Sequence, residues 1–479
     1  MISIIKKKFV GDALIYSVHP IISKLLTFIL IPLYTSFLSP ADYGNLQYIM
    51  LFGAFLRGVS QMGLNSSFWK FRSQDGINKK QIALNLTLNQ LALGVFLLVA
   101  YLMFTYVFGN FDTVGLFIAL FYVGLVIKTF SENLLLFNRA NFQAKKYLKV
   151  ALFQTILLFS LNILFVKFLA LNFQGIIYAY LISFGVTAVL FYKSLQREFD
   201  GRYNWSISKE MIVYGFPIMI GNIGLMILSL SDRWFIKHFN TDDELGLYSY
   251  GYKFADLILV FIIQIFNMTF IPLAWKLQKK AQAQAVFSEV RNLIYLLFPA
   301  ISLIALSIIL LLAELMTSNK SYMEGLDIIV MIAFSHVFYG FYLFHSLGLQ
   351  FAKKTKFMVI CNGVAVIVNL LLNGLLIPKY GAIGASFATL ASYFIMLLIT
   401  LIYSQRFYPL NFSFLKTIFH FTVLLAFALG VTYVFINNDF SVWFKSLITF
   451  SAGVVLTLIL LVTSGVTRKT LRKISDITA

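Results

Sequence analysis

The chain has 479 residues, of which 60% are hydrophobic and only 12% are charged, and its mean hydropathy is +0.85. A soluble protein of this size cannot cover that much apolar surface with so few polar residues, so the composition excludes a soluble globular protein. The formal net charge of +19 would suit a nucleic-acid partner, but the placement of the charges along the chain indicates otherwise.

A basic N-terminal segment, MISIIKKKFVGDALIY, leads into the first apolar run. This run contains His19, Pro20, Lys24 and Pro32, and it has no clear small-residue cleavage site. More apolar runs follow it. It is therefore predicted to be an uncleaved first helix, not a removable signal peptide.

Apolar runs long enough to cross a bilayer then recur to the end of the chain. They predict an all-α, polytopic membrane protein with about 14 transmembrane helices. In chain order the expected helices are 12–37, 43–69, 83–108, 114–137, 148–169, 173–193, 211–237, 246–275, 290–316, 325–350, 357–376, 382–403, 415–436 and 443–465.

The basic residues follow the loops. If the chain starts in the cytoplasm, the segments on that side hold 28 of the 38 Lys and Arg residues, whereas the outer loops hold five. The positive-inside rule then places both termini in the cytoplasm, with the protein in the cell (inner or cytoplasmic) membrane. The net charge thus reports topology, and no nucleic-acid partner is expected.

Two pairs of stretches indicate an internal repeat. FLSPADYGNLQY around the second span resembles HFNTDDELGLYSY around the eighth, so that Gly44 corresponds to Gly246. The stretch 160–184, SLNILFVKFLALNFQGIIYAYLISF, is echoed by 369–393, NLLLNGLLIPKYGAIGASFATLASY. Spans 1–6 therefore match spans 7–12. Because six is even, the repeat is parallel, a known transporter design.

The repeat predicts the domain organisation. Residues 1–200 form an N-lobe with spans 1–6, and residues 209–404 form a C-lobe with spans 7–12. Spans 13 and 14, in 413–466, are additions, and 467–479 is a basic cytoplasmic tail.

Sequence motifs give no sign of catalysis in the loops. The chain contains no GxxxxGK[ST] or HExxH motif and no GxSxG with plausible partners, so neither a nucleotide-driven motor nor an enzyme is indicated. The single cysteine, Cys361, excludes an intrachain disulfide and a CxxC metal site. No cofactor is expected.

Three cations stand near mid-membrane in the first half of the chain: Lys24, Arg57 and Lys128. Glu132 follows Lys128 by four residues, so the two can pair on one helix face. Lys24 and Arg57 have no obvious partner, and a dianionic phosphate would supply one, because Arg presents a fork that matches phosphate oxygens. A hidden internal ion pair or snorkelling is the other interpretation.

A second charged group lies near the outer ends of spans 7 and 8, beginning with MILSLSDRWFIKHF at 226–239. Adjacent helical residues point about 100° apart, so Asp232 and Arg233 are not expected to pair with each other. Cross-helix pairs of Asp232 with Lys253 and of Arg233 with Asp256 are expected instead. They would act as an outer gate or as a brace.

Three histidines fall within spans: His19, His336 and His345. Histidine carries protons near neutral pH, but a single buried histidine is more often a hydrogen-bonded core residue. Both interpretations stay open. Glu132, Asp232 and Asp256 are candidate carboxylates for ion coupling.

The stretches YTSFLSPADYGNLQ, LSLSDRWFIKHFNTDDELGLYSYGYKFAD and NGLLIPKYGAIGASFATLASY resemble the signature regions of polysaccharide (O-antigen) flippases. This family belongs to the multidrug/oligosaccharidyl-lipid/polysaccharide exporter superfamily, together with MATE drug exporters and lipid II flippases. The resemblance covers essentially the whole chain.

The resemblance implies two six-helix bundles arranged as a V that alternate between inward-open and outward-open states. The implied cargo is an oligosaccharide repeat unit on polyprenyl (undecaprenyl) diphosphate, which moves to the outer leaflet for cell-surface polysaccharide synthesis. Lys24, Arg57 and Lys128 would hold the diphosphate. A proton or sodium gradient would supply the energy. The implied partners are membrane lipids and the polysaccharide polymerase and glycosyltransferases of the same pathway.

Two classes of alternative remain at this point, a multidrug exporter and a membrane enzyme. A MATE-type multidrug exporter would use acids to attract cationic drugs, whereas cations dominate mid-membrane here. A membrane polysaccharide polymerase usually has a large outer loop, and none is evident. An acyltransferase would need a membrane-embedded catalytic histidine, for which His336 is the candidate.

Overall fold

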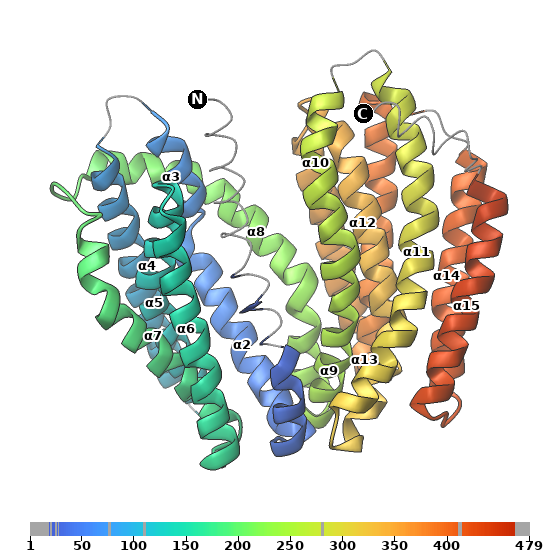
Figure 1. The fold of residues 1–479 in the computed structure, drawn as a ribbon, viewed down its shortest axis with the longest axis horizontal. Helices are drawn as coiled ribbons and strands as arrows, with labels where there is room; N and C mark the ends of the chain where they lie inside the picture. Colours follow the sequence, from blue (N-terminus) through green and yellow to red (C-terminus); the bar gives the residue numbers. More distant parts are fainter. Residues whose placement is uncertain are drawn as a thin grey trace. The chain divides into compact units, whose positions relative to one another are not determined.

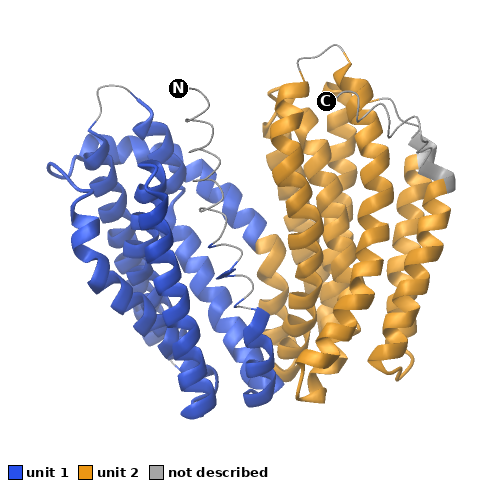
Figure 2. Cartoon of the chain, viewed as in Figure 1, with its two compact units in different colours: residues 1–226 blue, residues 227–479 orange. Residues whose placement is uncertain are grey.

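The computed structural model describes residues 19, 22, 23, 26, 28–74, 78–108, 112–278, 282–410 and 414–464, with side chains in the last range described for 417–461. Within these residues the chain is helical and contains no strand (Figure 1). It divides into two compact units, residues 1–226 and 227–479 (Figure 2). The prediction of an all-α polytopic fold is confirmed.

Unit 1 consists of long helices joined by short turns. The second predicted span is divided in two by Met62 and Gly63, whose φ angles of 43° and 63° are left-handed. The elements of unit 1 are α2 (Pro40–Gln61), α3 (Leu64–Arg72), α4 (Lys79–Val107), α5 (Thr113–Ala140), α6 (Ala144–Ile163), the π-helical η1 (Leu164–Phe168), α7 (Asn172–Gln196) and the first part of α8 (Trp205–Phe239).

Unit 2 begins within α8 and has the same character. Its eighth predicted span is interrupted by a π-helical segment, and a short 3-10 helix precedes α12. Its further elements are α9 (Asp242–Ile258), η2 (Leu259–Gln264), α10 (Ile265–Leu277), α11 (Ala283–Met316), η3 (Lys320–Leu326), α12 (Ile329–Phe351), α13 (Lys356–Phe407), α14 (Phe414–Ile436) and α15 (Val442–Ser464).

The helices account for the predicted spans. Eleven segments of the described chain are long and apolar enough to cross a membrane. One of them, α13, contains two predicted spans that meet at Gly381. The second predicted span corresponds to α2 with α3, and the shorter apolar helix Phe28–Phe37 belongs to the first. All fourteen predicted spans thus have a helical counterpart, the first of them described only in part.

The repeat seen in the sequence reappears in how helices begin. The hydroxyl of Ser39 accepts a hydrogen bond from the amide of Asp42 at 3.1 Å and caps α2. The hydroxyl of Thr241 accepts one from the amide of Glu244 at 3.2 Å and caps α9. Each cap residue precedes the matched glycine of its repeat by five positions, so the two stretches share a local structure as well as a pattern.

The second pair of matched stretches shares a turn. Asn172 at the start of α7 and Gly381 within α13 occupy equivalent positions, and both are left-handed, with φ angles of 47° and 51°. At Gly381 the helix restarts, and the carboxylate of Glu244 accepts a hydrogen bond from the amide of Ala382 at 2.7 Å. An acidic side chain is favourable at a helix N-terminus because the free amides there carry partial positive charge.

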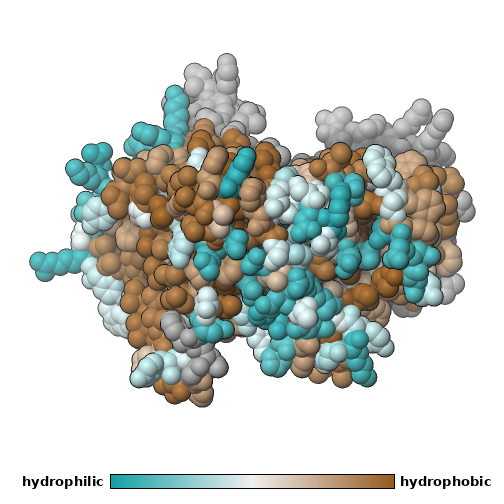
Figure 3. All heavy atoms as spheres, turned by 90° about the horizontal axis from the view of Figure 1, so that it is seen from below, coloured by the Kyte–Doolittle hydropathy of each residue, from teal (hydrophilic) through white to brown (hydrophobic). Residues whose placement is uncertain are grey.

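The outer faces of the helices are apolar. Large exposed side chains such as Phe96, Val189 and Met268, which are 66%, 77% and 77% exposed, lie within spans and face outward. In the view of Figure 3, brown apolar atoms cover the flanks, whereas hydrophilic atoms gather on part of the end face. A surface of this kind is suited to lipid contact.

Candidate functional site

The buried arginine of unit 1 is the centre of a polar cluster. Arg57, the fifth-last residue of helix α2, is only 8% exposed. Its Nη1 donates to the hydroxyl of Thr129 at 2.6 Å, and its Nη2 donates to Oε2 of Glu132 at 2.5 Å. Arg57, for which the sequence offered no obvious partner, therefore has the internal ion pair that the alternative interpretation expected. The packing of α2 against α5 brings it to a carboxylate that the helical spacing had assigned to Lys128 alone.

Glu132 serves two cations. Lys128 Nζ lies 3.1 Å from Glu132 Oε1, which confirms the pair expected from their four-residue spacing. The side chains of Lys128 and Glu132 are 30% and 31% exposed, so the cluster reaches the surface of unit 1 on this side. Two cations share one carboxylate, and these three residues together carry one excess positive charge.

Neutral polar groups extend the cluster. The amide nitrogen of Gln61 donates to Glu132 Oε2 at 3.3 Å. Beyond it, a chain of hydrogen bonds joins α3, α4 and α5: Gln90 Nε2 donates to Asn65 Oδ1 at 3.1 Å, and Asn133 Nδ2 donates to Gln90 Oε1 at 3.1 Å. Buried amides need such partners, and in a bilayer they also hold helices in register.

The break between α2 and α3 lies directly beside this cluster. Gln61 is the last residue of α2, and the left-handed Met62 and Gly63 follow it. The third predicted cation of this site, Lys24, lies outside the described residues.

The charged group of unit 2 is built differently from the expectation. Arg233 Nη1 lies 3.3 Å from Oδ1 of the adjacent Asp232, so the two do pair. The long side chain of Arg233 folds back along its own helix, where Nη1 also donates to the carbonyl oxygen of Ser229 at 3.1 Å. The angle between neighbouring side chains had argued against this pair, but the reach of an arginine removes that constraint.

Aromatic residues of α9 enclose this pair. The hydroxyl of Tyr248 donates to Asp232 Oδ2, and the ring of Tyr252 lies 4.7 Å from the guanidinium carbon of Arg233. Asp232 and Arg233 are 1% and 7% exposed. A tyrosine hydroxyl and a cation–π contact thus supply the cross-helix partners of the pair.

Asp256 contacts a histidine. His336 Nε2, on α12, lies 3.0 Å from Asp256 Oδ1. Asp256 is 14 residues from the start of α9, or roughly 21 Å along the helix, so it lies deeper than the outer end where it was expected. Lys253, three residues before it, is partly buried.

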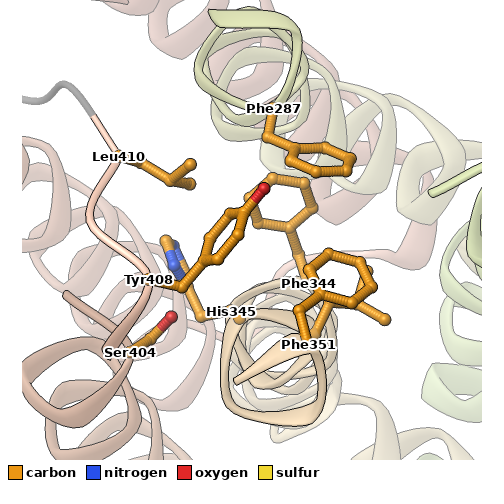
Figure 4. A pocket seen from close by; sticks show the side chains of 9 residues that line it. Phe287, Phe344, His345, Phe351, Ser404, Tyr408 and Leu410 are labelled. Atoms are coloured by element: carbon orange, nitrogen blue, oxygen red, sulfur yellow. The ribbon is translucent and has the colours of Figure 1, made fainter. Parts of the chain in front are cut away.

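Two further features of unit 2 were not predicted from the sequence. Asn369 Oδ1 accepts hydrogen bonds from Ser231 Oγ at 2.9 Å and from Asn373 Nδ2 at 3.0 Å, which ties α8 to α13. A small pocket lies where α11, α12 and α13 meet (Figure 4). Its lining is mainly aromatic and includes one of the three histidines singled out in the sequence, His345. The lining residues are Phe287, Phe344, His345, Leu347, Gly348, Phe351, Ser404, Tyr408 and Leu410.

Metal ligands do not cluster in this part of the chain. Among the described residues, no group of three or more His, Cys, Asp or Glu side chains is placed to hold a metal ion.

Comparison with known families decides the kinship of the chain. Residues 9–278, which are more than half of the chain, match the family described as "Polysaccharide biosynthesis protein". The chain belongs to the polysaccharide biosynthesis protein family. Both charged clusters described above, from Arg57 to Asp256, lie within the matched residues.

Relatives of this family member occur in Haemophilus influenzae (strain ATCC 51907 / DSM 11121 / KW20 / Rd). An "Uncharacterized membrane protein" is 24% identical over 404 residues, covering 78% of this chain and 94% of the relative. "Lsg locus putative protein 1" is 24% identical over 288 residues, covering 57% of this chain and 67% of the relative.

Solved structures share the fold of this family member. "Lipid II flippase MurJ, inward closed conformation" matches with a TM-score of 0.57 and 16% identity over 93% of this chain and 98% of that one. An inward-facing multidrug resistance MATE family transporter of the MOP superfamily matches with a TM-score of 0.60 and 15% identity over 80% and 94%. The protein is therefore a multi-pass membrane protein with a MATE-like fold.

The sequence did not reveal the uncharged residues of the clusters around Arg57 and around Asp232 and Arg233. Thr129 and Gln61 contact the charged groups of unit 1, and Tyr248 and Tyr252 contact those of unit 2. A signal was present for Tyr248, because it stands in the matched LGLYSY stretch. The others follow only from helix packing.

Proposed function

We propose that this protein is a flippase that moves an oligosaccharide repeat unit, linked to polyprenyl diphosphate, from the cytoplasmic to the outer leaflet. The translocated unit then serves cell-surface polysaccharide synthesis. Transport proceeds by alternating access and is driven by an ion gradient. The protein is not an enzyme in this proposal, because it transfers its cargo without changing it.

The observation that carries the proposal is the excess positive charge around Arg57. Arg57 and Lys128 share the single carboxylate of Glu132, and the Lys128 side is partly exposed. A charge left uncompensated within a span is costly, so it is retained where a ligand of opposite charge completes it. A diphosphate fits, because it carries negative charge and several acceptor oxygens for a guanidinium fork and an ammonium group. Lys24 is the proposed third cation.

Kinship and fold support the same class of cargo. The family is named for polysaccharide biosynthesis, and a protein of the same fold is titled a lipid II flippase. Both names point to cell-surface glycans, and the second points to a lipid-linked cargo. The proposed partners are accordingly lipid-linked oligosaccharide, membrane lipids, and the polymerase and glycosyltransferases that act before and after translocation.

The ends of the helices support the proposed orientation. In unit 1, basic residues gather where α3 ends and α4 begins, at Lys70, Arg72, Lys79 and Lys80. The opposite ends, where α2 and α5 begin, carry the acids Asp42 and Asp112 instead. By the positive-inside rule the basic end faces the cytoplasm, so both termini of the protein are cytoplasmic and the membrane is the cytoplasmic membrane.

Deleting the gene in its host and analysing the lipid extract by mass spectrometry tests the proposal. Accumulation of a complete repeat unit on polyprenyl diphosphate is expected, together with loss of surface polymer, and the intact gene should restore both. A matched strain carrying the empty vector gives the baseline.

Two other outcomes would overturn the proposal. Loss of polymer while single repeat units still reach the outer leaflet would indicate a polymerase. An unchanged lipid extract with new sensitivity to cationic drugs would indicate a multidrug exporter, and the positive charge around Arg57 would then have no ligand to explain it.

A further inference from the structure

We propose that Asp256 and His336 form a proton-binding site in unit 2 and that this site couples transport to a proton gradient. The first part stands on the geometry of the two side chains. The second part rests on the proposed transport function, for which no ion is otherwise assigned.

The two side chains form a contact with unequal exposure. His336 Nε2 lies 3.0 Å from Asp256 Oδ1, close enough for an ion pair when the imidazole is protonated. The side chain of His336 is 3% exposed, whereas that of Asp256 is 44% exposed. His336 Nε2 has no well-directed hydrogen-bond acceptor in the described structure. A proton on this nitrogen would therefore be held by the charge of the carboxylate more than by a well-aligned hydrogen bond.

The exposed carboxylate provides a route for the proton. Asp256 lies roughly 21 Å from the start of α9, well inside a membrane-spanning segment. A carboxylate at such a depth faces water and not lipid, because contact with hydrocarbon would be too costly. Protons thus reach Asp256 from an aqueous space, and His336 holds them on the buried side.

The other titratable groups around the pair do not replace either partner. On α8, Asp232 and Arg233 pair at 3.3 Å, and both also interact electrostatically with Asp256. The ring of Tyr252 contacts the guanidinium of Arg233 and packs edge-on against His336 at 5.8 Å. Lys253 lies on the same helix as Asp256. Further titratable groups on the neighbouring helices and on α12 itself include Tyr393 of α13, Tyr339, Tyr342 and His345 of α12, Tyr295 and Arg291 of α11, and His420 of α14.

The backbone around the pair is able to respond to its charge. The π-helical η2 begins at Leu259, three residues after Asp256. Its Ile263 packs against Gly340, one turn after His336, where an added Cβ would lie 2.7 Å from Ile263 Cδ1. Two helices thus approach closely beside the pair, and an irregular segment lies next to it, as often occurs at functional sites. Protonation or deprotonation of the pair therefore strengthens or weakens the attraction between α9 and α12.

The same helix supplies a matched control. His345 is also buried on α12, but its Nε2 lies 2.7 Å from the hydroxyl of Tyr295, which is a neutral partner. Without a carboxylate, a buried imidazole has nothing to favour its charged form. His345 is therefore expected to stay neutral where His336 takes up a proton.

The test is nitrogen-15 NMR of the full-length, histidine-labelled protein in membranes, recorded between about pH 5 and 8, where histidine ordinarily titrates. The His336 signal, assigned by its absence in His336→Gln, is expected to convert from neutral to protonated. In Asp256→Asn the protonated form of His336 should be lost from this range. In the control His345→Gln, the titration of His336 should be unchanged.

The outcomes separate this site from the proposed function. A His336 signal that stays neutral throughout, or one that titrates identically in Asp256→Asn, overturns the proton site even if the deletion strain accumulates lipid-linked oligosaccharide. In the converse outcome, His336 titrates as expected while deletion of the gene leaves the lipid extract unchanged. That result supports the proton-binding site and refutes the proposed lipid-linked cargo. Coupling itself predicts that His336→Gln, but not His345→Gln, fails to restore surface polymer to the deletion strain, and full restoration by both overturns it.

Discussion

The charged clusters of unit 1 and unit 2 contain similar residues but differ in net charge and in solvent exposure. In unit 1, Arg57 and Lys128 share the carboxylate of Glu132. The side chains of Lys128 and Glu132 are about 30% exposed. In unit 2, Asp232 and Arg233 neutralise each other and have side chains only 2% and 8% exposed. The comparison teaches that a charged group within a span is not in itself a ligand site. In the proposed function, the excess of one sign that reaches the surface binds the ligand, whereas the balanced, enclosed pair braces unit 2.

The largest effect is expected from Arg57→Ala. The change removes the buried guanidinium that contacts Thr129 and Glu132, and with it the fork proposed to hold the phosphate oxygens. Export should be abolished, as measured by surface polymer in the deletion strain. Arg139→Ala, at the end of the same α5 helix that carries Glu132, is the control and should restore polymer. Normal polymer with Arg57→Ala would contradict the role of the excess charge.

The second effect concerns stability and tests the enclosed pair. Asp232→Ala leaves Arg233 buried beside Tyr248 without its carboxylate, and breaking a buried pair in this way costs about 3–5 kcal/mol. Thermal unfolding of the purified protein should show the loss. The double variant Asp232→Ala with Arg233→Leu should recover much of it, because no lone charge is left. Equal stability of the single variant and the wild type would mean that the pair does not brace unit 2.

A third comparison uses the equivalent left-handed turns. Gly381→Ala places a Cβ 1.7 Å from Glu244 Oε1 at a residue with a φ of 51°, so it should destabilise unit 2 by about 1–3 kcal/mol. The matched change in unit 1, Asn172→Gly, relieves a left-handed residue and should be neutral or stabilising by under about 1 kcal/mol. Thermal unfolding of both variants checks this. Loss of stability in Asn172→Gly as large as in Gly381→Ala would show that the turns are not equivalent.

The smallest effect is expected from Lys128→Gln. This cation is partly exposed, and the Arg57–Glu132 pair survives its loss. Exposed pairs contribute roughly 1 kcal/mol or less, so the rate of export should fall by about fivefold at most. The rate of surface-polymer recovery after induction of the variant gene measures it. A complete loss of export would give Lys128, not Arg57, the leading role.

The sequence predicted those features that depend on spacing along one helix. The span plan and the Lys128–Glu132 pair are both of this kind. It did not predict that Arg57 meets Glu132, because that contact depends on how α2 packs against α5. Nothing in an apolar sequence fixes which faces of two helices meet.

The wrong interpretation of Asp232 and Arg233 has a different cause. It considered the directions of the two side chains but not the length of the arginine, which reaches back to Ser229. It also considered only ionised groups as partners for a carboxylate, so the hydroxyl of Tyr248 was missed. Within membranes, neutral donors are partners of equal importance, because water is not available to replace them.

The matched helical hairpins of the two units differ in length. The hairpin Lys79–Ala140 contains 62 residues, and its counterpart Ala283–Phe351 contains 69, a difference that equals the seven residues of η3. The added segment lies against α9 so closely that a Cβ on Gly251 would be 1.8 Å from the carbonyl oxygen of Gly325. If the two halves descend from one ancestral hairpin set, this contact is younger than the duplication. Gly251 and Gly325 would then be the residues that allow the inserted segment of the second half to pack against α9.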